Sequence, residues 1–184
     1  MRGLTVRAGT PLETFRRMTK PTPYKPKQRT VQARVLSSAG WLDGTFHLMS
    51  MQHLADYLSH HAFYPLTNVA SPELGQLGFF ALARAETYLV IAPKLEAVTS
   101  ALQTGALERH HATFVFPGGT VEGQLDLLQG LRLLDYADRT TGFVSVSNAR
   151  VWIRNSRRTS AEKVDRLLLN PARLVGVTEP ERLA

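Results

Sequence analysis

The chain has 184 residues, of which 43% are hydrophobic and 20% are charged, a composition typical of a globular protein and not of a disordered chain. It contains no cysteine, which excludes disulfides, thiolate metal sites and cysteine nucleophiles. The net charge of +7 is unevenly spread: residues 1–34 hold nine Lys and Arg against one acid, residues 35–149 hold five against ten, and residues 150–184 hold eight against four. A mildly acidic body therefore lies between a strongly basic N-terminal arm and a basic C-terminal segment.

The apolar residues are distributed in short stretches. No run of about 18 apolar residues, the length that spans a bilayer, occurs in the chain. The first residues, "MRGLTVRAGTPLETF", have no apolar core typical of a signal peptide. We therefore expect no membrane span and a cytoplasmic protein.

Residues 1–30 predict a basic arm with a short docking helix. Thr10 fits an N-cap and Glu13 follows three residues later, which is capping-box chemistry. Leu12 and Phe15 make a narrow apolar edge on this helix, and a helix so short is stable only when it docks on something. The following "PTPYKPKQR" alternates proline with Lys and Tyr, which favours an extended strap.

A 19-residue pattern occurs twice in the chain. "GWLDGTFHLMSMQHLADYL" begins at Gly40, and "GTVEGQLDLLQGLRLLDYA" begins 79 residues later at Gly119. One inserted residue then aligns Phe63–Val69 with Phe143–Ala149. Small, acidic, aromatic and apolar positions keep their order throughout, which indicates an internal duplication.

Within each copy the pattern predicts strands before a short helix. "TVQARVLSSAG" and "HATFVFPGG" are rich in β-branched and aromatic residues and end at turn residues. The next strand of each copy alternates apolar residues around Gly44 or Gly123, and an interior strand glycine indicates a bulge, a bend or close packing. A helix with an apolar stripe follows, made of Met51, Leu54 and Leu58 in the first copy and of Leu131, Leu134 and Ala137 in the second.

Each copy is expected to close with further strands. Phe79–Pro93 and Leu167–Pro180 share an apolar run, a polar step, a second apolar run and a proline. Thr159 and Glu162 fit a capping box, whereas the repeat predicts a strand at "KVDRLLLN" (163–170). The sequence leaves 159–169 open between helix and strand, and a short helical turn that feeds a strand is favoured. The fold class is then α+β and β-rich, with two tandem β-β-α-β-β modules of bent-sheet or barrel-like form that can pack as a pseudo-dimer. The modules are expected at 31–97 and 111–184, with a helical linker at 98–110.

No enzyme signature is present in the sequence. The chain lacks a phosphate-binding loop, a dinucleotide fingerprint, a nucleophile elbow and a zinc-protease motif. Its six histidines do not recur between the copies, so we predict no metal site and no cofactor. Asp56 and Asp135 recur in both copies, and we expect them on solvated helix faces and not as paired catalytic acids.

The basic segments carry the predicted function. Arginine offers bidentate contacts to phosphate and tryptophan stacks on bases, so "RVWIRNSRR" (150–158) is typical of a nucleic-acid contact. The predicted binding residues are Arg16, Arg17, Lys20, Tyr24, Lys25, Lys27, Arg29, Arg150, Trp152, Arg154, Arg157 and Arg158. The first hypothesis is a non-enzymatic protein that binds DNA or RNA. The alternative is an adaptor or a structural subunit of a homo-oligomer or larger complex, which docks on an acidic protein surface through Leu12 and Phe15.

Overall fold

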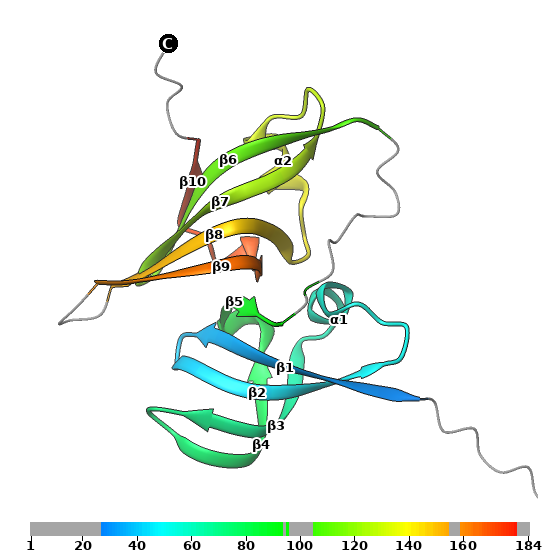
Figure 1. The fold of residues 1–184 in the computed structure, drawn as a ribbon, viewed down its shortest axis with the longest axis vertical. Helices are drawn as coiled ribbons and strands as arrows, with labels where there is room; N and C mark the ends of the chain where they lie inside the picture. Colours follow the sequence, from blue (N-terminus) through cyan, green and yellow to red (C-terminus); the bar gives the residue numbers. More distant parts are fainter. Residues whose placement is uncertain (1–26, 94, 96–104, 155–158, 180–184) are drawn as a thin grey trace, which may run out of the picture.

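The computed structural model describes residues 27–93, 95, 105–154 and 159–179. These form one ten-stranded antiparallel sheet with two short helices (Figure 1). The strands are β1 (Gln28–Ser37), β2 (Gly40–Met49), β3 (Phe63–Ser71), β4 (Gly75–Ala83), β5 (Thr87–Ile91), β6 (Leu107–Phe116), β7 (Gly119–Leu128), β8 (Val144–Arg154), β9 (Thr159–Leu169) and β10 (Gly176–Thr178). The helices are α1 (Leu54–His60) and α2 (Leu133–Arg139), and 3-10 turns occur at η1 (Arg84–Glu86) and η2 (Pro171–Arg173). The order across the sheet is β10-β6-β7-β8-β9-β5-β1-β2-β3-β4.

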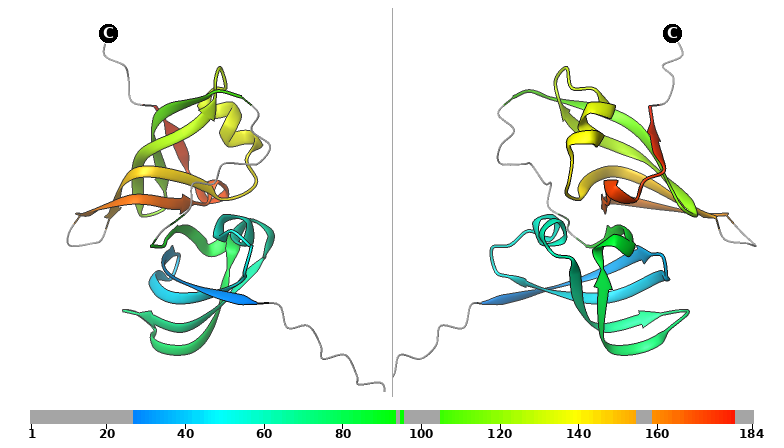
Figure 2. Two further views of the ribbon diagram at one scale, coloured as in Figure 1. Left: turned by 45° about the vertical axis from the view of Figure 1, so that its right-hand side comes forward. Right: turned by 180° about the vertical axis from the view of Figure 1, so that it is seen from behind.

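The β-β-α-β-β pattern appears twice, as the sequence predicts. Module 1 runs β1-β2-α1-β3-β4 and module 2 runs β6-β7-α2-β8-β9. The repeat extends further than the five predicted elements, because each module continues into a 3-10 turn and a closing strand. β5 pairs with β1 in module 1, and β10 pairs with β6 in module 2. The predicted match of Phe79–Pro93 with Leu167–Pro180 corresponds to the end of β4, η1 and β5 in module 1, and to the end of β9, η2 and β10 in module 2. Figure 2 shows the two modules stacked along the long axis of the molecule.

The alternation predicted for the second strand of each module is confirmed. In β2, Leu42, Gly44, Phe46 and Leu48 are all buried, and the residues between them are more exposed. β7 shows the same alternation, with its apolar positions inside. The half of the sheet in each module therefore has one apolar, buried face. This agrees with side chains that alternate between the two faces along each strand.

A bulge lies beside the interior glycine of each module. The register between β2 and β3 shifts so that Ala70 pairs with Asp43 and Thr67 with Thr45, which gives β3 one extra residue. Asn68 lies in this step with φ +51°, in the left-handed region that asparagine tolerates. Asn148 repeats the feature in β8 with φ +48°. A bulge of this kind bends the sheet, as the interior glycines predict.

The two modules are joined by pairing of β5 with β9, which we call the junction. Leu89 pairs with Leu169 and Val90 with Leu168, and the Asn170 backbone N–H donates to Tyr88 O at 2.9 Å. β9 is the counterpart of β4, and β5 is the counterpart of β10. The junction therefore joins non-equivalent strands, so the pseudo-dimer is head-to-tail and not two-fold symmetric.

Alternate residues of the junction strands enter different hydrophobic cores. Val90 and Leu168 belong to the core cluster of module 1, whereas Leu89 and Leu169 belong to that of module 2. All four side chains are fully buried. Phe143 of module 2 also packs in the cluster of module 1. Each core is thus completed by residues of the other module.

Asn170 connects the end of β9 to the turn before β5. Its side chain is 2% exposed, and its Nδ2 donates to Arg84 O at 3.1 Å and to Thr87 O at 2.9 Å. Its Oδ1 accepts from Ala172 N at 3.2 Å. One buried amide therefore satisfies backbone groups of both 3-10 turns, which would otherwise be left without partners.

Three local predictions are wrong. Thr159–Leu169 is strand throughout, so no helical turn follows Thr159, because the long pairing with β8 outweighs a local cap signal. β6 begins at Leu107, so the predicted linker helix does not extend to His110; residues 98–104 lie outside the described residues. Met51 is 89% exposed and Leu134 is 65% exposed, and the helices bury Leu54, Leu58 and Leu133 instead.

The repeated glycines provide a matched pair for a stability test. A Cβ on Gly44 would lie 3.4 Å from Val69 Cγ2, in ordinary contact, whereas one on Gly123 would collide with Val146 Cγ1 and lie 3.0 Å from Ser147 O. We expect Gly123→Ala to lower the free energy of unfolding by about 1–3 kcal/mol through overpacking. Gly44→Ala should stay within about 0.5 kcal/mol of the parent, because the fit is neutral and alanine restricts the unfolded chain. Urea denaturation of both variants measures this, and equal effects would contradict the packing described.

Candidate functional site

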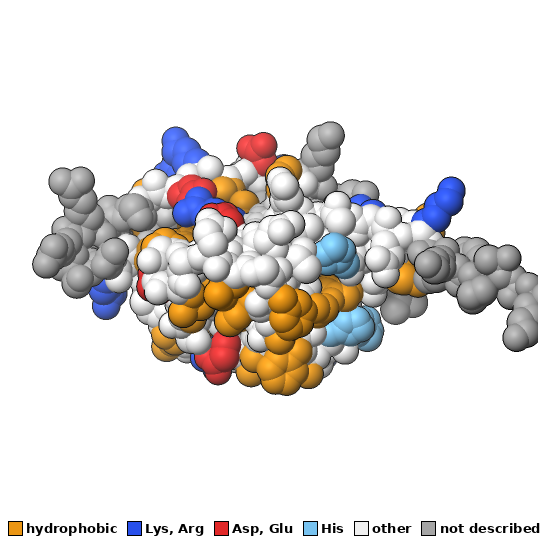
Figure 3. Space-filling model, turned by 90° about the horizontal axis from the view of Figure 1, so that it is seen from below, with side chains coloured by type: hydrophobic (Ala, Val, Ile, Leu, Met, Phe, Trp, Pro, Cys, Tyr) orange, Lys and Arg blue, Asp and Glu red, His pale blue; other side chains and the backbone are white. Residues whose placement is uncertain are grey.

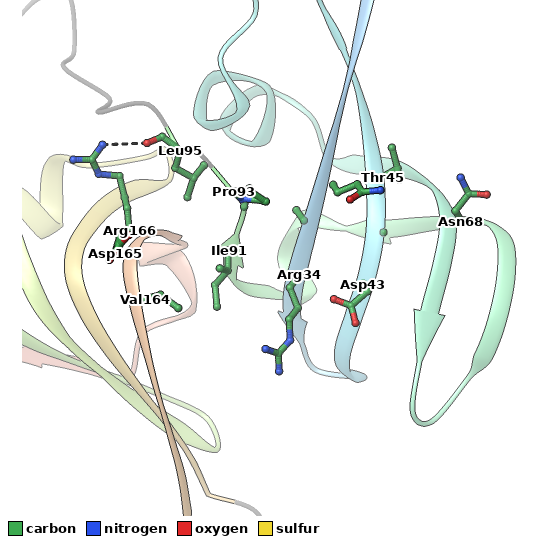
Figure 4. Close-up of a pocket in the computed structure, with 14 residues that line it drawn as sticks. Arg34, Asp43, Thr45, Asn68, Ile91, Pro93, Leu95, Val164, Asp165 and Arg166 are labelled. Atoms are coloured by element: carbon green, nitrogen blue, oxygen red, sulfur yellow. Dashed lines mark hydrogen bonds between the residues drawn. The ribbon is translucent and has the colours of Figure 1, made fainter.

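A cleft of about 910 Å³ lies between the modules. Figure 4 shows Arg34 and Asp43 on its module 1 side and Val164, Asp165 and Arg166 on its module 2 side. No histidine, lysine, serine or tyrosine of the described residues lines it. Its polar lining consists of Gln32, Arg34, Asp43, Thr45, Asn68, Asp165 and Arg166.

The cations at the cleft are engaged in holding the modules together. Arg34 Nη1 contacts Glu162 Oε1 at 2.9 Å, and its guanidinium lies 4.3 Å from the ring centroid of Trp41. Arg166 Nη1 donates to Leu95 O at 3.1 Å. The two arginines that line the cleft therefore already have partners within the chain.

A cationic surface lies on the outer side of the hairpin formed by β8 and β9. Ala149 and Val151 of β8 are buried, whereas Arg150 and Arg154 are exposed and Trp152 is half-buried. The predicted sharing of one strand face by Arg150, Trp152 and Arg154 follows from this alternation. We call these three residues and Lys163 the hairpin cation face.

Lys163 joins this face through the strand register. It lies on β9 directly opposite Arg150, and Ala161 lies opposite Trp152. Lys163 and Ala161 are both exposed. Like charges directly opposite each other on paired strands destabilise a sheet, so the Arg150–Lys163 pair lowers stability when nothing lies between the two cations.

Two carboxylates border the hairpin cation face. Glu122 of β7 pairs with Arg150 on the side away from Lys163, and its Oε1 also lies 3.7 Å from His111 Nε2. Asp165 is exposed two residues after Lys163 on β9. The three cations, Arg150, Arg154 and Lys163, outnumber these acids, so the face keeps a positive excess.

The remaining predicted binding residues are placed elsewhere or not described. Lys27 is exposed just before β1. Arg29 Nη2 donates to Gln52 O at 2.7 Å, so this guanidinium ties β1 to the turn before α1. Figures 1 and 2 show the start of β1 on the opposite side of the molecule from the tip of the β8–β9 hairpin. Arg16, Arg17, Lys20, Tyr24, Lys25, Arg157, Arg158 and the docking residues Leu12 and Phe15 lie outside the described residues.

The histidines do not gather into a metal site in the part of the chain that the structure describes, where no three His, Asp or Glu side chains converge. His47 Nε2 lies 2.8 Å from Thr67 Oγ1, and His60 Nδ1 lies 2.7 Å from the backbone oxygen of Asp56. His61 packs edge-on against Tyr57 with ring centroids 4.5 Å apart. These contacts assign the three histidines to local structure.

The Asp-Tyr step that recurs in both copies is structural. Asp56 and Asp135 are exposed, as predicted for solvated helix faces. Burial raises the pKa of the Tyr57 and Tyr136 hydroxyls above their ordinary value. Burial likewise raises the pKa of Tyr64, whose hydroxyl donates to Leu58 O at 2.6 Å. These phenols stay protonated and support the cores.

Comparison with protein families, with curated proteins and with solved structures finds no match to this chain. Within the residues that the structure covers, no helix is both long and apolar enough to cross a membrane.

The cation pair on the hairpin predicts an effect on stability. Lys163→Gln keeps a polar, slightly shorter side chain and removes one of the two opposed charges, so we expect the free energy of unfolding to stay level or rise by about 0.2–1 kcal/mol at low salt. The gain should shrink at high salt, where exposed charges are screened. Urea denaturation at both salt concentrations measures it. A decrease of more than about 1 kcal/mol in the free energy of unfolding would show that Lys163 stabilises the fold and would contradict a destabilising charge pair.

Proposed function

We propose that the protein is a non-enzymatic binding protein that contacts DNA or RNA through the hairpin cation face and its basic N-terminal arm. One observation carries the proposal: Arg150 and Lys163 lie directly opposite each other, with Trp152 and Arg154 on the same face. Two adjacent cations repel in the free protein, and a phosphate between them would remove that repulsion.

The residue types suit a nucleic-acid backbone. Arginine presents a planar fork of donors that matches two phosphate oxygens, and lysine adds a point charge. Trp152 lies between the two arginines along β8, where a base can stack on its indole while phosphates on either side contact the arginines. Arg157 and Arg158 follow Arg154 in the sequence and add to the same basic segment.

The N-terminal arm is proposed as a second contact. Residues 1–34 carry nine basic residues and one acid, and the described part of this region starts on the opposite side of the molecule from the hairpin. Two cationic regions far apart would engage separate stretches of a long nucleic acid, and their contributions to the binding free energy should then add.

The adaptor function remains the second candidate. It depends on Leu12 and Phe15, which are outside the described residues, so its support is the apolar edge of the predicted helix. A protein partner that co-purifies after nuclease treatment, and is lost in a Leu12→Ser and Phe15→Ser variant, would favour it over nucleic-acid binding.

The proposal predicts salt-dependent binding that requires the hairpin. In a fluorescence-anisotropy titration with labelled single-stranded and duplex oligonucleotides, the protein should bind at low salt and lose affinity steeply as salt rises. Arg150→Gln with Arg154→Gln should weaken binding and reduce the salt slope by about 1.8 on a duplex, because each phosphate contact contributes roughly 0.9. Trp152→Ala should weaken binding to the single strand more than to the duplex.

The matched control is Arg132→Gln with Arg139→Gln. Both arginines are exposed in module 2, at the two ends of α2, so this variant has the same net charge as the hairpin variant. It should keep the affinity and the salt slope. Binding that is absent at low salt, insensitive to salt, or reduced equally by the two double variants would rule out the hairpin cation face as the binding site.

A further inference from the structure

The sheet ends in two strands that are the counterparts of the strands at the junction. Figure 1 places β10 at one end of the molecule and β4 at the other. β10 corresponds to β5, because each closes its module on the first strand, and β4 corresponds to β9, because each is the last strand of a β-β-α-β-β unit. The molecule therefore presents at its two ends the same kinds of strand edge that pair inside it.

The correspondence extends to individual residues. Leu169 pairs with Val144 and Leu82 pairs with Tyr64, so Leu82 is the counterpart of Leu169 and Ala81 that of Leu168. In the same way, Gly176 and Val177 pair with β6 as Leu89 and Val90 pair with β1. The register of the junction then translates into Gly176 opposite Leu82 and Val177 opposite Ala81.

Positions that the junction buries are exposed at the two free ends. Phe143 is 6% exposed and Leu168 is fully buried, whereas their counterparts at the β4 end are Phe63, which is 61% exposed, and Ala81, which is exposed. Figure 3 views the molecule from the side of this end and shows hydrophobic side chains gathered there.

The β10 end shows the same contrast. Ala55 is 3% exposed and Tyr88 is 8% exposed at the junction, whereas their counterparts Leu134 and Val175 are 65% and 72% exposed. Apolar residues whose counterparts are buried at the junction are therefore exposed at both ends of the molecule.

The exposed residues at the two ends also match in size. Inside the junction, the large Leu168 and the small Ala55 belong to one hydrophobic cluster and line one pocket. At the free ends the counterparts are the small Ala81 and the large Leu134. The large residue is on the last strand at the junction and on the helix at the free ends, so a contact between two free ends would again combine one leucine with one alanine. The combined side-chain volume therefore suits the same close packing.

The edge of β4 lacks the features that usually prevent pairing with another chain. Its sequence, GQLGFFALA, has no charged residue and no proline, and Phe79 on it is 62% exposed. The GVT of β10 is also uncharged. Exposed edge strands in soluble proteins are normally protected by charges, prolines, bulges or a very short length. β10 is short, with three residues, but the nine-residue β4 has none of these features, so its edge is open to pairing with a strand.

From these observations we propose that the chain assembles head to tail, with β10 of one molecule pairing with β4 of the next in the register of the β5–β9 junction. The partner is a second copy of this chain, because the complementary edge is its own. Such a contact joins different surfaces of the two copies, so it leaves a free β4 and a free β10 at the ends and permits further addition.

The contact between copies has fewer polar interactions than the junction. The positions of Asn170 and Arg84 are taken by Ala83 and Pro171, so the buried amide and the arginine hydrogen bonds have no counterpart. The counterparts of Arg34 and Glu162 are Thr113 and Gly75, so the ion pair at the junction has no equivalent between copies. Assembly is therefore weaker than the joining of the modules, and it is reversible and dependent on concentration.

Proline substitutions can block each end separately. Pro65 lies opposite Ala81 on β3 and has no N–H, so the Ala81 backbone does not depend on a hydrogen bond from it, and in the junction register the Ala81 N–H faces the free edge. Ala81→Pro should therefore remove an edge donor and leave the β3–β4 pairing in place. Val177→Pro does the same on the outer edge of β10, since Val90, its counterpart, faces β9.

The test is sedimentation velocity on the full chain over concentrations from about 10 μM to about 1 mM, the range of weak association. The parent chain should shift from the 20.4 kDa species to dimers and larger species. Ala81→Pro and Val177→Pro should each remain single chains. An equimolar mixture of the two should form a dimer and stop there, because only one working β10 and one working β4 remain.

The controls separate edge pairing from loss of fold. Ala81→Val and Val177→Thr keep the N–H and should assemble like the parent, and all variants should keep the circular dichroism spectrum and melting temperature of the parent. Phe63→Ser, which leaves both edges intact, should weaken assembly. A parent chain that stays a single species up to about 1 mM would assign these edges to another occupant and overturn the proposal. So would assembly of either proline variant alone, or a mixture that stays monomeric.

Discussion

The architecture depends on the β5–β9 junction, where each strand contributes side chains to two cores at once. Val90 and Leu168 point into module 1, and Leu89 and Leu169 point into module 2. Separating the modules would expose all four, at a cost of about 1.5–3 kcal/mol for each side chain. Neither module has a complete core without the other, so the two are expected to fold as one cooperative unit although each has the same β-β-α-β-β pattern.

The second constraint is the bulge that recurs beside each interior glycine. Asn68 and Asn148 adopt a left-handed conformation in the third strand of each module, and in module 2 the strands approach so closely at Gly123 that a Cβ would collide. The bend lets one antiparallel sheet wrap around an apolar face. It also sets which residues of β8 turn outward, and so places Arg150, Trp152 and Arg154 together.

Much of the fold is predictable from the sequence because each element is predicted independently from two copies of the same pattern. The Gly44 and Gly123 positions, the alternation around them and the final strand pair all follow from the match between copies. The capping box at Thr159 misled because a local hydrogen bond competes with a strand that pairs along its length. Met51 was wrongly assigned to a buried helix face because helical spacing cannot show where a helix of seven residues begins. Leu134 was wrongly assigned because the spacing does not show which face of α2 is buried.

The candidate site was only partly accessible from the sequence. The common face of Arg150, Trp152 and Arg154 follows from a period of two within one strand. Lys163 was missed, because it is brought opposite Arg150 by a register that no local pattern specifies. The head-to-tail order of the modules was missed for the same reason. It arises from pairing between residues about 80 positions apart, which depends on the packing of the whole sheet.

Native-state hydrogen exchange tests the central role of the junction most directly. The amides of Leu89, Val90, Leu168, Leu169 and Asn170 should be among the slowest to exchange, and in denaturant they should open together with the inner strands of both modules, in a single global step. Two separate opening steps, one for each module, with the junction amides exchanging before either, would contradict a shared core and show that the modules are independent units.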